Sequence, residues 1–255
     1  MRSGAGNLKL TGERTLPGIS KENYWFKRHL VAYEFAQSRA VGKVVIDIGC
    51  GEGYGPYLLS KSAKRVIGID IAPEVIEHAR KKYNFPNLTF ETMDVKELKF
   101  PDDSSDLIVS LQVIEHLPEE LPFLKEIARV LKKDGEAVLS TPNRKTISPG
   151  SLKPINPFHF REYTPSEFRE LLSDFFEDVS VVGVLHAGIL RLNERIGAVD
   201  FIKVYEMSKL NPRLWLHRIL CPLIMTKDFK ITDEDIDDCL DIIAVCKGKR
   251  NFSSK

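Results

Sequence analysis

The sequence predicts an α/β fold built on a doubly wound, parallel sheet. Short apolar runs, beginning with Val44–Ile46, alternate with segments of helical periodicity over residues 44–142. Alternation of this kind is typical of parallel strands joined by right-handed helical crossovers. The first run is also β-branched throughout, as expected of a strand that is buried on both faces of its sheet.

Local signals place the individual elements. Strands are expected at residues 44–48, 65–70, 88–94, 106–111 and 136–142, with two later strands at 176–185 and 239–248. Helices are expected at residues 55–62, 73–82, 118–131 and 163–175. Pro73 suits the first turn of the second helix, and Gly135 is a stop signal after the third. In the fourth helix, Thr164 and Glu167 have the spacing of a capping box, with Pro165 at the first helical position.

A single domain spanning residues 1–255 accounts for this pattern, because a chain of 255 residues can bury one substantial α/β core. Residues 1–39 are expected to form an arm and a helix ahead of the first strand. Residues about 186–238, between the last two strands, are too long for a hairpin connection. We expect them to form a helical insertion, or lid, that covers the ligand-binding end of the sheet.

Composition limits the classes of partner. The 37 basic and 36 acidic residues nearly balance, which argues against an extended surface for nucleic acid. No apolar run approaches the length of a membrane span, and the N-terminal MRSGAGNLKL lacks the apolar core of a signal peptide, so a cytoplasmic protein is expected. Four cysteines without CxxC spacing are interpreted as reduced core residues: Cys50, Cys221, Cys239 and Cys246.

The stretch VIDIGCGEGYG at residues 45–55 raises the question of function. It packs four glycines behind the first strand: Gly49, Gly51, Gly53 and Gly55. A strand, a bare glycine turn and a helix N-terminus together make a site for a ligand that carries negative charge. The G-x-G-x-x-G turn that binds nicotinamide dinucleotides is absent, because its third glycine would fall on Tyr54 or Pro56.

Acidic side chains at the ends of the first three strands narrow the choice of ligand. Asp47 lies in the first strand, two residues before the glycines. Asp70 ends the second strand, where a carboxylate can accept hydrogen bonds from both ribose hydroxyls. Asp94, followed by Val95, ends the third strand and offers an acid for an exocyclic amine beside an apolar contact for a purine. Together these signals describe an adenosyl ligand that lacks a pyrophosphate.

These segments resemble the class I S-adenosylmethionine-dependent methyltransferases. The resemblance rests on VIDIGCGEGYG, GIDIAPEVIEHA, MDV and FPDDSSDLIVSLQVIEHL, within residues 40–140. It implies a Rossmann-like, seven-stranded sheet with an antiparallel last strand, and S-adenosyl-L-methionine as cofactor. It also implies that the glycine backbone lies against the methionine moiety, that Ile71 flanks the adenine ring, and that Gln112 sits beside the methionine end.

A narrower resemblance covers most of the remaining chain. TGERTLPG, ENYWFKRH, STPNRKTISPG, PINPFHFRE and DFKITDEDIDDCLDIIAV are similar to actinobacterial methyltransferases linked to methylglucose lipopolysaccharide synthesis. That family implies methylation of a sugar hydroxyl in polysaccharide biosynthesis. Two alternatives remain open: a methyltransferase for another small acceptor, such as a quinone or lipid, and a binding module that holds the cofactor without catalysis.

Methyl transfer to a hydroxyl requires removal of a proton, for which a neutral imidazole is suited near neutral pH. His116, in QVIEHL just after the fourth strand, is one candidate base; its alternative role is to shape the loop. His159, in the NPFHFRE loop after the fifth strand, is the other. No metal site is predicted, because the acidic run Asp233–Asp238 is interpreted as a solvated loop.

Aromatic and polar residues in two segments are candidate acceptor-binding groups. Pyranose rings pack their C–H faces on aromatic planes, and their hydroxyls need polar partners. Tyr24 and Trp25 are candidates for a wall of the pocket, with packing inside the core as the alternative. Glu13 or Arg14 is expected to close the pocket as part of the arm. The loop after the fifth strand supplies the remaining candidates: Asn143, Asn156, Phe158, Phe160, Arg161, Glu162 and Tyr163.

Overall fold

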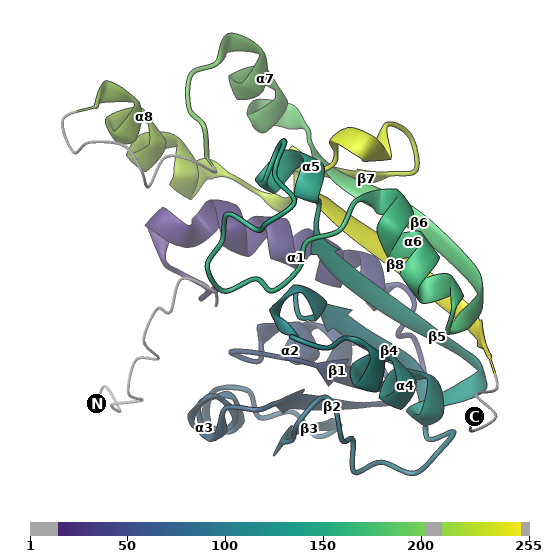
Figure 1. Cartoon of the computed structure of the whole chain (residues 1–255). Coiled ribbons are helices and arrows are strands. Elements are labelled where there is room, and N and C mark those ends of the chain that lie inside the picture. Colours follow the sequence, from purple (N-terminus) through teal and green to yellow (C-terminus); the bar gives the residue numbers. More distant parts are fainter. Residues whose placement is uncertain (1–14, 202–210, 251–255) are drawn as a thin grey trace, which may run out of the picture.

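The computed structural model describes residues 15–201 and 211–250. Their architecture is one mixed sheet of eight strands in the order β3-β2-β1-β4-β5-β8-β6-β7 (Figure 1). Its strands are β1 (Val44–Ile48), β2 (Arg65–Asp70), β3 (Leu88–Thr92), β4 (Ser105–Leu111), β5 (Leu131–Pro142), β6 (Phe176–His186), β7 (Phe229–Thr232) and β8 (Asp241–Lys249). The first five strands pair in parallel, whereas the β5–β8, β8–β6 and β6–β7 pairs are antiparallel.

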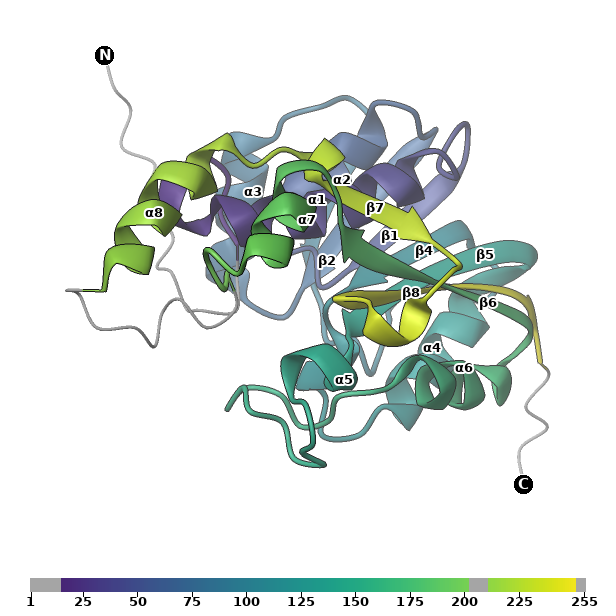
Figure 2. The same cartoon turned by 90° about the horizontal axis from the view of Figure 1, so that it is seen from above.

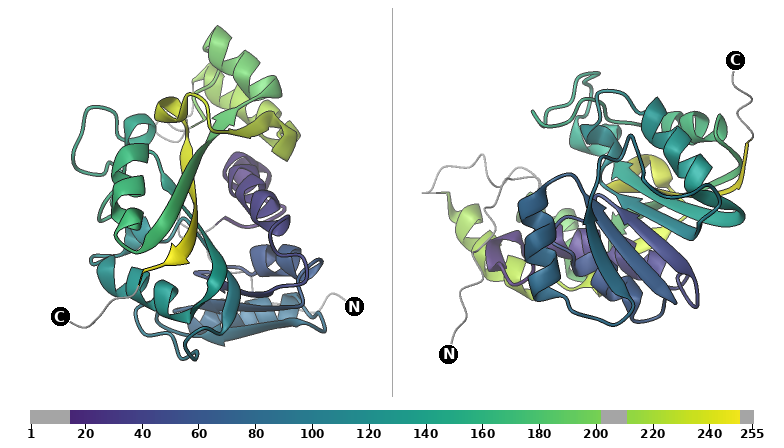
Figure 3. Two further views of the ribbon diagram at one scale, coloured as in Figure 1. Left: turned by 90° about the vertical axis from the view of Figure 1, so that its right-hand side faces the viewer. Right: turned by 90° about the horizontal axis from the view of Figure 1, so that it is seen from below.

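The helices cover both faces of this sheet. They are α1 (Asn23–Gln37), α2 (Tyr54–Ser60), α3 (Pro73–Lys82), α4 (Leu121–Val130), α5 (Arg144–Ile147), α6 (Pro165–Ser173), α7 (Gly188–Ile196) and α8 (Pro212–Leu220). One hydrophobic cluster joins α1, α2 and α3 to one face, and a second joins α4 and α6 to the other. Figures 2 and 3 show the sheet between these two layers.

Helix α1 is held across the sheet by a buried ion pair. The guanidinium of Arg28 donates to both carboxylate oxygens of Asp241 at 2.5 Å, and also to the Leu240 carbonyl at 2.8 Å. Arg28 is 1% exposed, and Asp241 begins β8 beside the end of β5. The contact therefore places the middle of α1 near the ends of the parallel strands.

The predicted fold is confirmed in its main features. The doubly wound parallel strands are present, α3 has the predicted bounds, and α6 begins with the predicted capping box between Thr164 and Glu167. The four cysteines are buried and free. The last strand, β8, is antiparallel to both of its neighbours.

Three expectations were wrong in detail. The sheet has eight strands rather than seven, because residues Phe229–Thr232 pair with the outer edge of β6 at Gly183–His186. The segment between β6 and β8 is consequently not wholly helical. The helix expected at 118–131 starts later, at Leu121, and the following strand starts earlier, at Leu131.

The connection from β6 to β8 carries α7, α8 and β7. Figure 1 shows α7 and α8 above α1, and α7 follows directly on the end of β6. Among the residues that the structure describes, no helix combines the length and apolar character needed to cross a bilayer.

Candidate functional site

The glycine turn after β1 is needed for two different physical reasons. Gly49, Gly51 and Gly53 have φ angles of 74°, 53° and 97°, in the left-handed region that glycine adopts without steric penalty. A Cβ atom on Gly49 would also lie 2.4 Å from the Val113 side chain. Gly55 has no positive φ angle, but a Cβ there would lie 2.1 Å from the Tyr33 ring. Glycine is therefore needed in this turn for two reasons: its backbone adopts positive φ angles, and the side chains of Val113 and Tyr33 lie too close for a Cβ atom.

Asp70, at the end of β2, is bound to this turn. One carboxylate oxygen accepts the Gly51 N–H at 3.0 Å, and the other accepts the Ala72 N–H at 3.0 Å, just before α3. Each carboxylate oxygen has a second lone pair, so hydroxyls of a ligand can still be accepted. The adjacent Ile71 is 66% exposed, so its side chain is accessible to a ligand. Asp70 can therefore cap the start of α3 and still bind a ligand.

The other predicted cofactor residues lie at neighbouring strand ends. Asp94 follows β3 and accepts the Lys96 N–H at 2.9 Å, while Val95 is largely buried. Gln112 follows β4 with φ of 58°, and its backbone and side-chain amides both reach Ser140 of β5. Because β1, β2, β3 and β4 are parallel, these residues share one edge of the sheet.

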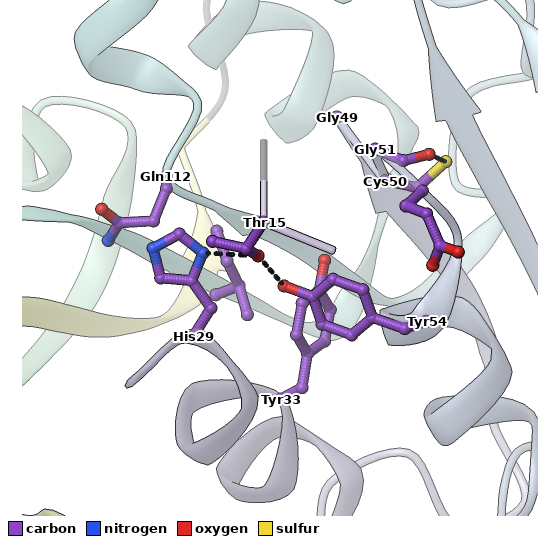
Figure 4. A pocket seen from close by; sticks show the side chains of 10 residues that line it. Thr15, His29, Tyr33, Gly49, Cys50, Gly51, Tyr54 and Gln112 are labelled. Carbon is purple, nitrogen blue, oxygen red and sulfur yellow. Dashed lines mark hydrogen bonds between the residues drawn. The ribbon is translucent and has the colours of Figure 1, made fainter. Parts of the chain in front are cut away.

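A pocket opens at this edge, between the glycine turn, the end of β4 and helix α1 (Figure 4). The predicted residues Gly49, Gly51 and Gln112 line it. Sequence reasoning missed most of its other lining residues: Thr15, His29, Tyr33, Glu52, Tyr54 and Leu111. Cys50, interpreted as a core filler, also lines the pocket although it is only 3% exposed.

His29 enters the pocket from α1. Its Nδ1 lies 3.4 Å from the hydroxyl of Thr15, which lies 3.1 Å from the hydroxyl of Tyr54 (Figure 4). Burial lowers the pKa of His29 to about 4, so its imidazole is neutral at pH 7. Glu13 and Arg14 lie outside the described residues, but Thr15 shows that the segment just before α1 reaches this pocket.

Asp47 lies beneath the pocket rather than on its surface. It is fully buried, and the Tyr33 hydroxyl donates to its carboxylate at 3.1 Å. Burial raises the pKa of Asp47 well above its ordinary value. The structure therefore corrects its predicted role: Asp47 holds Tyr33, and Tyr33 lines the pocket.

Glu52 connects the glycine turn to α3. It is 1% exposed and accepts the Tyr83 hydroxyl at 2.7 Å. It also pairs with Lys82 and with Nε2 of His78, the latter at 3.1 Å. These contacts join the glycine turn to α3.

A second group of predicted residues gathers where the turn after β4 meets the loop after β5. The rings of His116 and His159 lie 4.9 Å apart, centroid to centroid. Nδ1 of His159 is 2.8 Å from the Glu162 carboxylate, and its Nε2 is 3.0 Å from the Asn156 amide nitrogen. The Phe160 N–H donates to the Glu115 carbonyl at 2.7 Å and holds the two segments together. The two candidate bases thus share one site.

The aromatic residues of this loop separate into two environments. Phe158 and Phe160 are 53% and 63% exposed, so neither anchors the loop to the core. Tyr163 is fully buried in the core, with the Arg161 guanidinium 4.8 Å from its ring. Arg161 also donates to Glu120 at 3.0 Å.

Two residues predicted to bind the acceptor have structural positions instead. Tyr24 is fully buried; its hydroxyl lies 2.9 Å from His186, and its ring stacks on Phe201. Asn143 is also fully buried, and its amide donates to the carbonyls of Asp237 and Cys239 at 2.9 Å each. Trp25 is partly buried against the core and lies under the Arg28 guanidinium.

A doubly wound sheet with a glycine turn after β1 and carboxylates after β2 and β3 defines a protein of the Rossmann-like, nucleoside-binding class. Comparisons with known proteins identify the family within this class. Residues 46–139 match the family model described as a methyltransferase domain. A Mycolicibacterium smegmatis protein named "Probable S-adenosylmethionine-dependent methyltransferase" is 42% identical over 93% of this chain and 94% of its own length. The chain therefore belongs to the S-adenosylmethionine-dependent methyltransferases.

Other relatives agree with this assignment. A Mycobacterium tuberculosis protein of the same description is 40% identical over 93% of this chain and 89% of its own. Among solved structures, a Haloferax volcanii methyltransferase in complex with the Trm112 activator has a TM-score of 0.61 at 19% identity, covering 91% of this chain and 95% of its own. That likeness shows the shared fold.

The residues present fit S-adenosyl-L-methionine. Gly49 and Gly51, which carry no side chain, line the pocket and leave the backbone open to a ligand. With the cofactor bound, the Asp70 carboxylate would hold the ribose, Ile71 and Val95 would contact the adenine, and Asp94 would accept its amine. Thr15, His29 and Gln112 line the pocket beside the turn. The bound group supplies an electrophilic methyl group.

Proposed function

We propose that this methyltransferase acts on a hydroxyl of a saccharide or oligosaccharide precursor. The observation that carries the proposal is the loop after β5, where Phe158 and Phe160 are exposed beside a cluster of buried polar groups. Large exposed aromatic rings offer flat surfaces for the C–H faces of pyranose rings. Asn156 and Arg161 supply polar groups that sugar hydroxyls require, and the buried Glu162 orients His159 beside them.

The acceptor loop is also close to the cofactor turn. Val113 contacts the position of Gly49, and His116 follows three residues later in the same turn after β4. The loop is held to this turn through the Phe160 N–H and through Nδ1 of His116, which donates to the Phe158 carbonyl at 3.1 Å. These contacts support the proposal that His116 and His159 lie beside a hydroxyl that approaches the methyl donor.

The segment between β6 and β8 completes this proposal as a lid. Its helices α7 and α8 lie beyond the ligand end of the sheet, and Asn23 of α1 donates to the carbonyls of Cys221 and Ile224 at 2.8 and 2.9 Å. These contacts connect the lid to the helix that carries His29. We infer one domain, with the acceptor held between the lid and the loop after β5.

A second candidate acceptor is an apolar molecule such as a lipid or quinone. It is favoured by the exposed apolar side chains of the lid: Ile189, Leu192, Ile196, Trp215, Leu216, Ile219, Leu223 and Met225. A Mycolicibacterium smegmatis fatty-acid O-methyltransferase is 32% identical to this chain, but only over 39% of it. That likeness does not extend over the whole chain, so it carries little information on the acceptor.

Product analysis distinguishes the two candidates. The enzyme is incubated with a labelled methyl donor and a panel of glucosides, mannosides, a fatty acid and a hydroquinone, and the methyl group is located by mass spectrometry and NMR. We expect a methyl ether on a sugar hydroxyl. Replacing both rings in Phe158→Ala/Phe160→Ala should raise KM for the sugar with little effect on cofactor affinity. Transfer to the fatty acid or hydroquinone alone would contradict the saccharide proposal.

A further inference from the structure

We propose that Glu115, His116 and His159 form a binding site for a divalent metal ion. One ligand atom from each residue lies within 4.8 Å of the other two. The ligand atoms around an ion with bonds near 2.1 Å lie about 3–4.2 Å apart, so only a small contraction is needed. The sequence did not predict this site, because Glu115 and His116 are adjacent in the chain while His159 lies on a different loop.

The two imidazoles are oriented as metal-binding histidines usually are. Nδ1 of His116 donates to the Phe158 carbonyl at 3.1 Å, and Nδ1 of His159 donates to the Glu162 carboxylate at 2.8 Å. A carbonyl and a carboxylate only accept hydrogen bonds, so both rings carry their proton on Nδ1. Nε2 is then the basic nitrogen of each ring. Second-shell bonds of this kind fix the tautomer and increase the basicity of the ligand.

In this structure the amide of Asn156 is hydrogen-bonded to Nε2 of His159, the nitrogen that would bind the metal. The Phe158 N–H donates to Oδ1 of Asn156 at 3.0 Å, which turns the amide nitrogen toward Nε2 of His159, also at 3.0 Å. The amide must rotate before His159 can bind an ion. Asn156 therefore holds the neutral tautomer in place and competes with the metal.

Charge at the site also matches a divalent cation. Glu115 is fully buried and Glu162 is 1% exposed, and both carboxylates lie against the histidine pair. A cation of charge two neutralises two carboxylates that are withdrawn from water. Two imidazoles with one carboxylate favour a transition-metal ion such as Mn²⁺ or Zn²⁺ over Mg²⁺ or Ca²⁺, which prefer oxygen ligands.

Three protein ligands leave open coordination positions, which a hydroxyl of the acceptor can fill. This part of the inference rests on the proposed function. A coordinated hydroxyl loses its proton to water more readily. Its oxygen then forms the bond to the methyl carbon, and the carbon–sulfur bond of the donor breaks with its electron pair remaining on sulfur. The histidines act here as ligands, which replaces their expected role as bases.

Metal binding can be measured without methyl transfer. The full-length protein is stripped with EDTA, and binding of Mn²⁺ and Zn²⁺ is followed by calorimetry and, for Mn²⁺, by electron paramagnetic resonance. We expect one ion per chain with micromolar or tighter affinity. His116→Ala, His159→Ala and Glu115→Gln should each weaken binding by about 100-fold or more, and Glu162→Gln by about 10–100-fold. Asn156→Ala should bind at least as tightly as the unaltered protein.

The matched control is Asp237→Asn, in the exposed acidic run outside this cluster, and it should leave metal affinity unchanged. Circular dichroism confirms that each variant is folded. Absence of metal binding by the unaltered protein would overturn the site, and so would folded His116→Ala and His159→Ala variants that bind the metal as tightly as the unaltered protein. Equal sugar methylation by stripped and loaded enzyme would overturn its catalytic part and leave the saccharide proposal standing. Metal binding without methylation of any sugar would instead remove the saccharide proposal and keep the site.

Discussion

The hydroxyl of Tyr33 donates a hydrogen bond to the buried carboxylate of Asp47, across 3.1 Å between α1 and β1. Tyr33 also contacts Gly55 at the start of α2, so one side chain connects the first strand, the pocket and the helix that follows the turn. The geometry of the glycine turn thus depends on a helix that precedes it in the sequence.

Tyr33→Phe tests this connection. The variant keeps the ring but leaves the carboxyl of Asp47 buried without this donor, which should lower the free energy of unfolding by about 1–3 kcal/mol. Chemical denaturation measures the change. Tyr57→Phe on α2 is the control, because it keeps the ring that stacks on Tyr83. Equal stability of Tyr33→Phe and the unaltered protein would show that the hydrogen bond contributes nothing.

Asp70→Ala should weaken the binding of S-adenosyl-L-methionine by about tenfold or more. The reason is that a hydrogen bond to a charged group contributes roughly 1.5–3 kcal/mol. The variant also releases the N–H groups of Gly51 and Ala72, so thermal stability should fall as well. Calorimetry with the cofactor measures the first effect. Asp102→Ala, on an exposed loop, is the control, and tight binding of NAD by the unaltered protein would contradict the assignment of the pocket.

Stability should depend on the ionisation of His29. Its pKa is about 4 in the folded protein, below the value of about 6.5 in an unfolded chain. The unfolded state therefore binds more protons between these values, and the free energy of unfolding should fall as the pH drops from about 6.5 to about 4. Urea denaturation at pH 7, 6 and 5 measures this slope.

His29→Gln should show a shallower slope than the unaltered protein. His217→Gln is a useful comparison, since burial also lowers the pKa of His217, which lies on α8 away from the pocket. If His29→Gln and the unaltered protein lose stability in parallel, His29 is not the group that titrates. Cofactor affinity should be nearly constant between pH 6 and 8, because His29 remains neutral there.

Arg28→Ala should destabilise the protein by about 3–5 kcal/mol, because it leaves the carboxylate of Asp241 buried without its partner. The double variant Arg28→Ala/Asp241→Ala should recover part of this loss. Lys81→Ala removes an exposed pair with Glu77 and should cost less than about 1 kcal/mol. Thermal unfolding compares these variants with Asp241→Ala, and a loss in the double variant equal to the sum of the two single losses would mean that the two charges do not interact.

Much of the cofactor half of the site could be predicted because its signals are local. Gly49, Gly51 and Gly53 come after the first strand, Asp70 ends the second, and Asp94 follows the third by two residues. Parallel strands place such positions at one edge of a sheet without any knowledge of side-chain packing. The spacing of these residues was sufficient to predict both the fold class and the kind of ligand.

The other half depended on contacts between distant segments. His29 carries no local signal of a ligand site; it reaches the pocket because Arg28 anchors α1 to β8. Asn143 looked like a ligand residue in a polar loop, but the carbonyls of Asp237 and Cys239, nearly a hundred residues later, bind its amide. Residues Phe229–Thr232 form a strand only because the edge of β6 is there to pair with.

The sequence by itself thus determined the sheet, the glycine turn and the carboxylates that define a methyltransferase, since all of these follow from backbone periodicity and from residue type at strand ends. Only the tertiary structure decided that His116 and His159 lie together, that Tyr24 is buried in the core, and that Asp47 acts through Tyr33. The physical reason is that burial and side-chain hydrogen bonding are set by which segments meet across the sheet. A residue's neighbours along the chain do not contain that information.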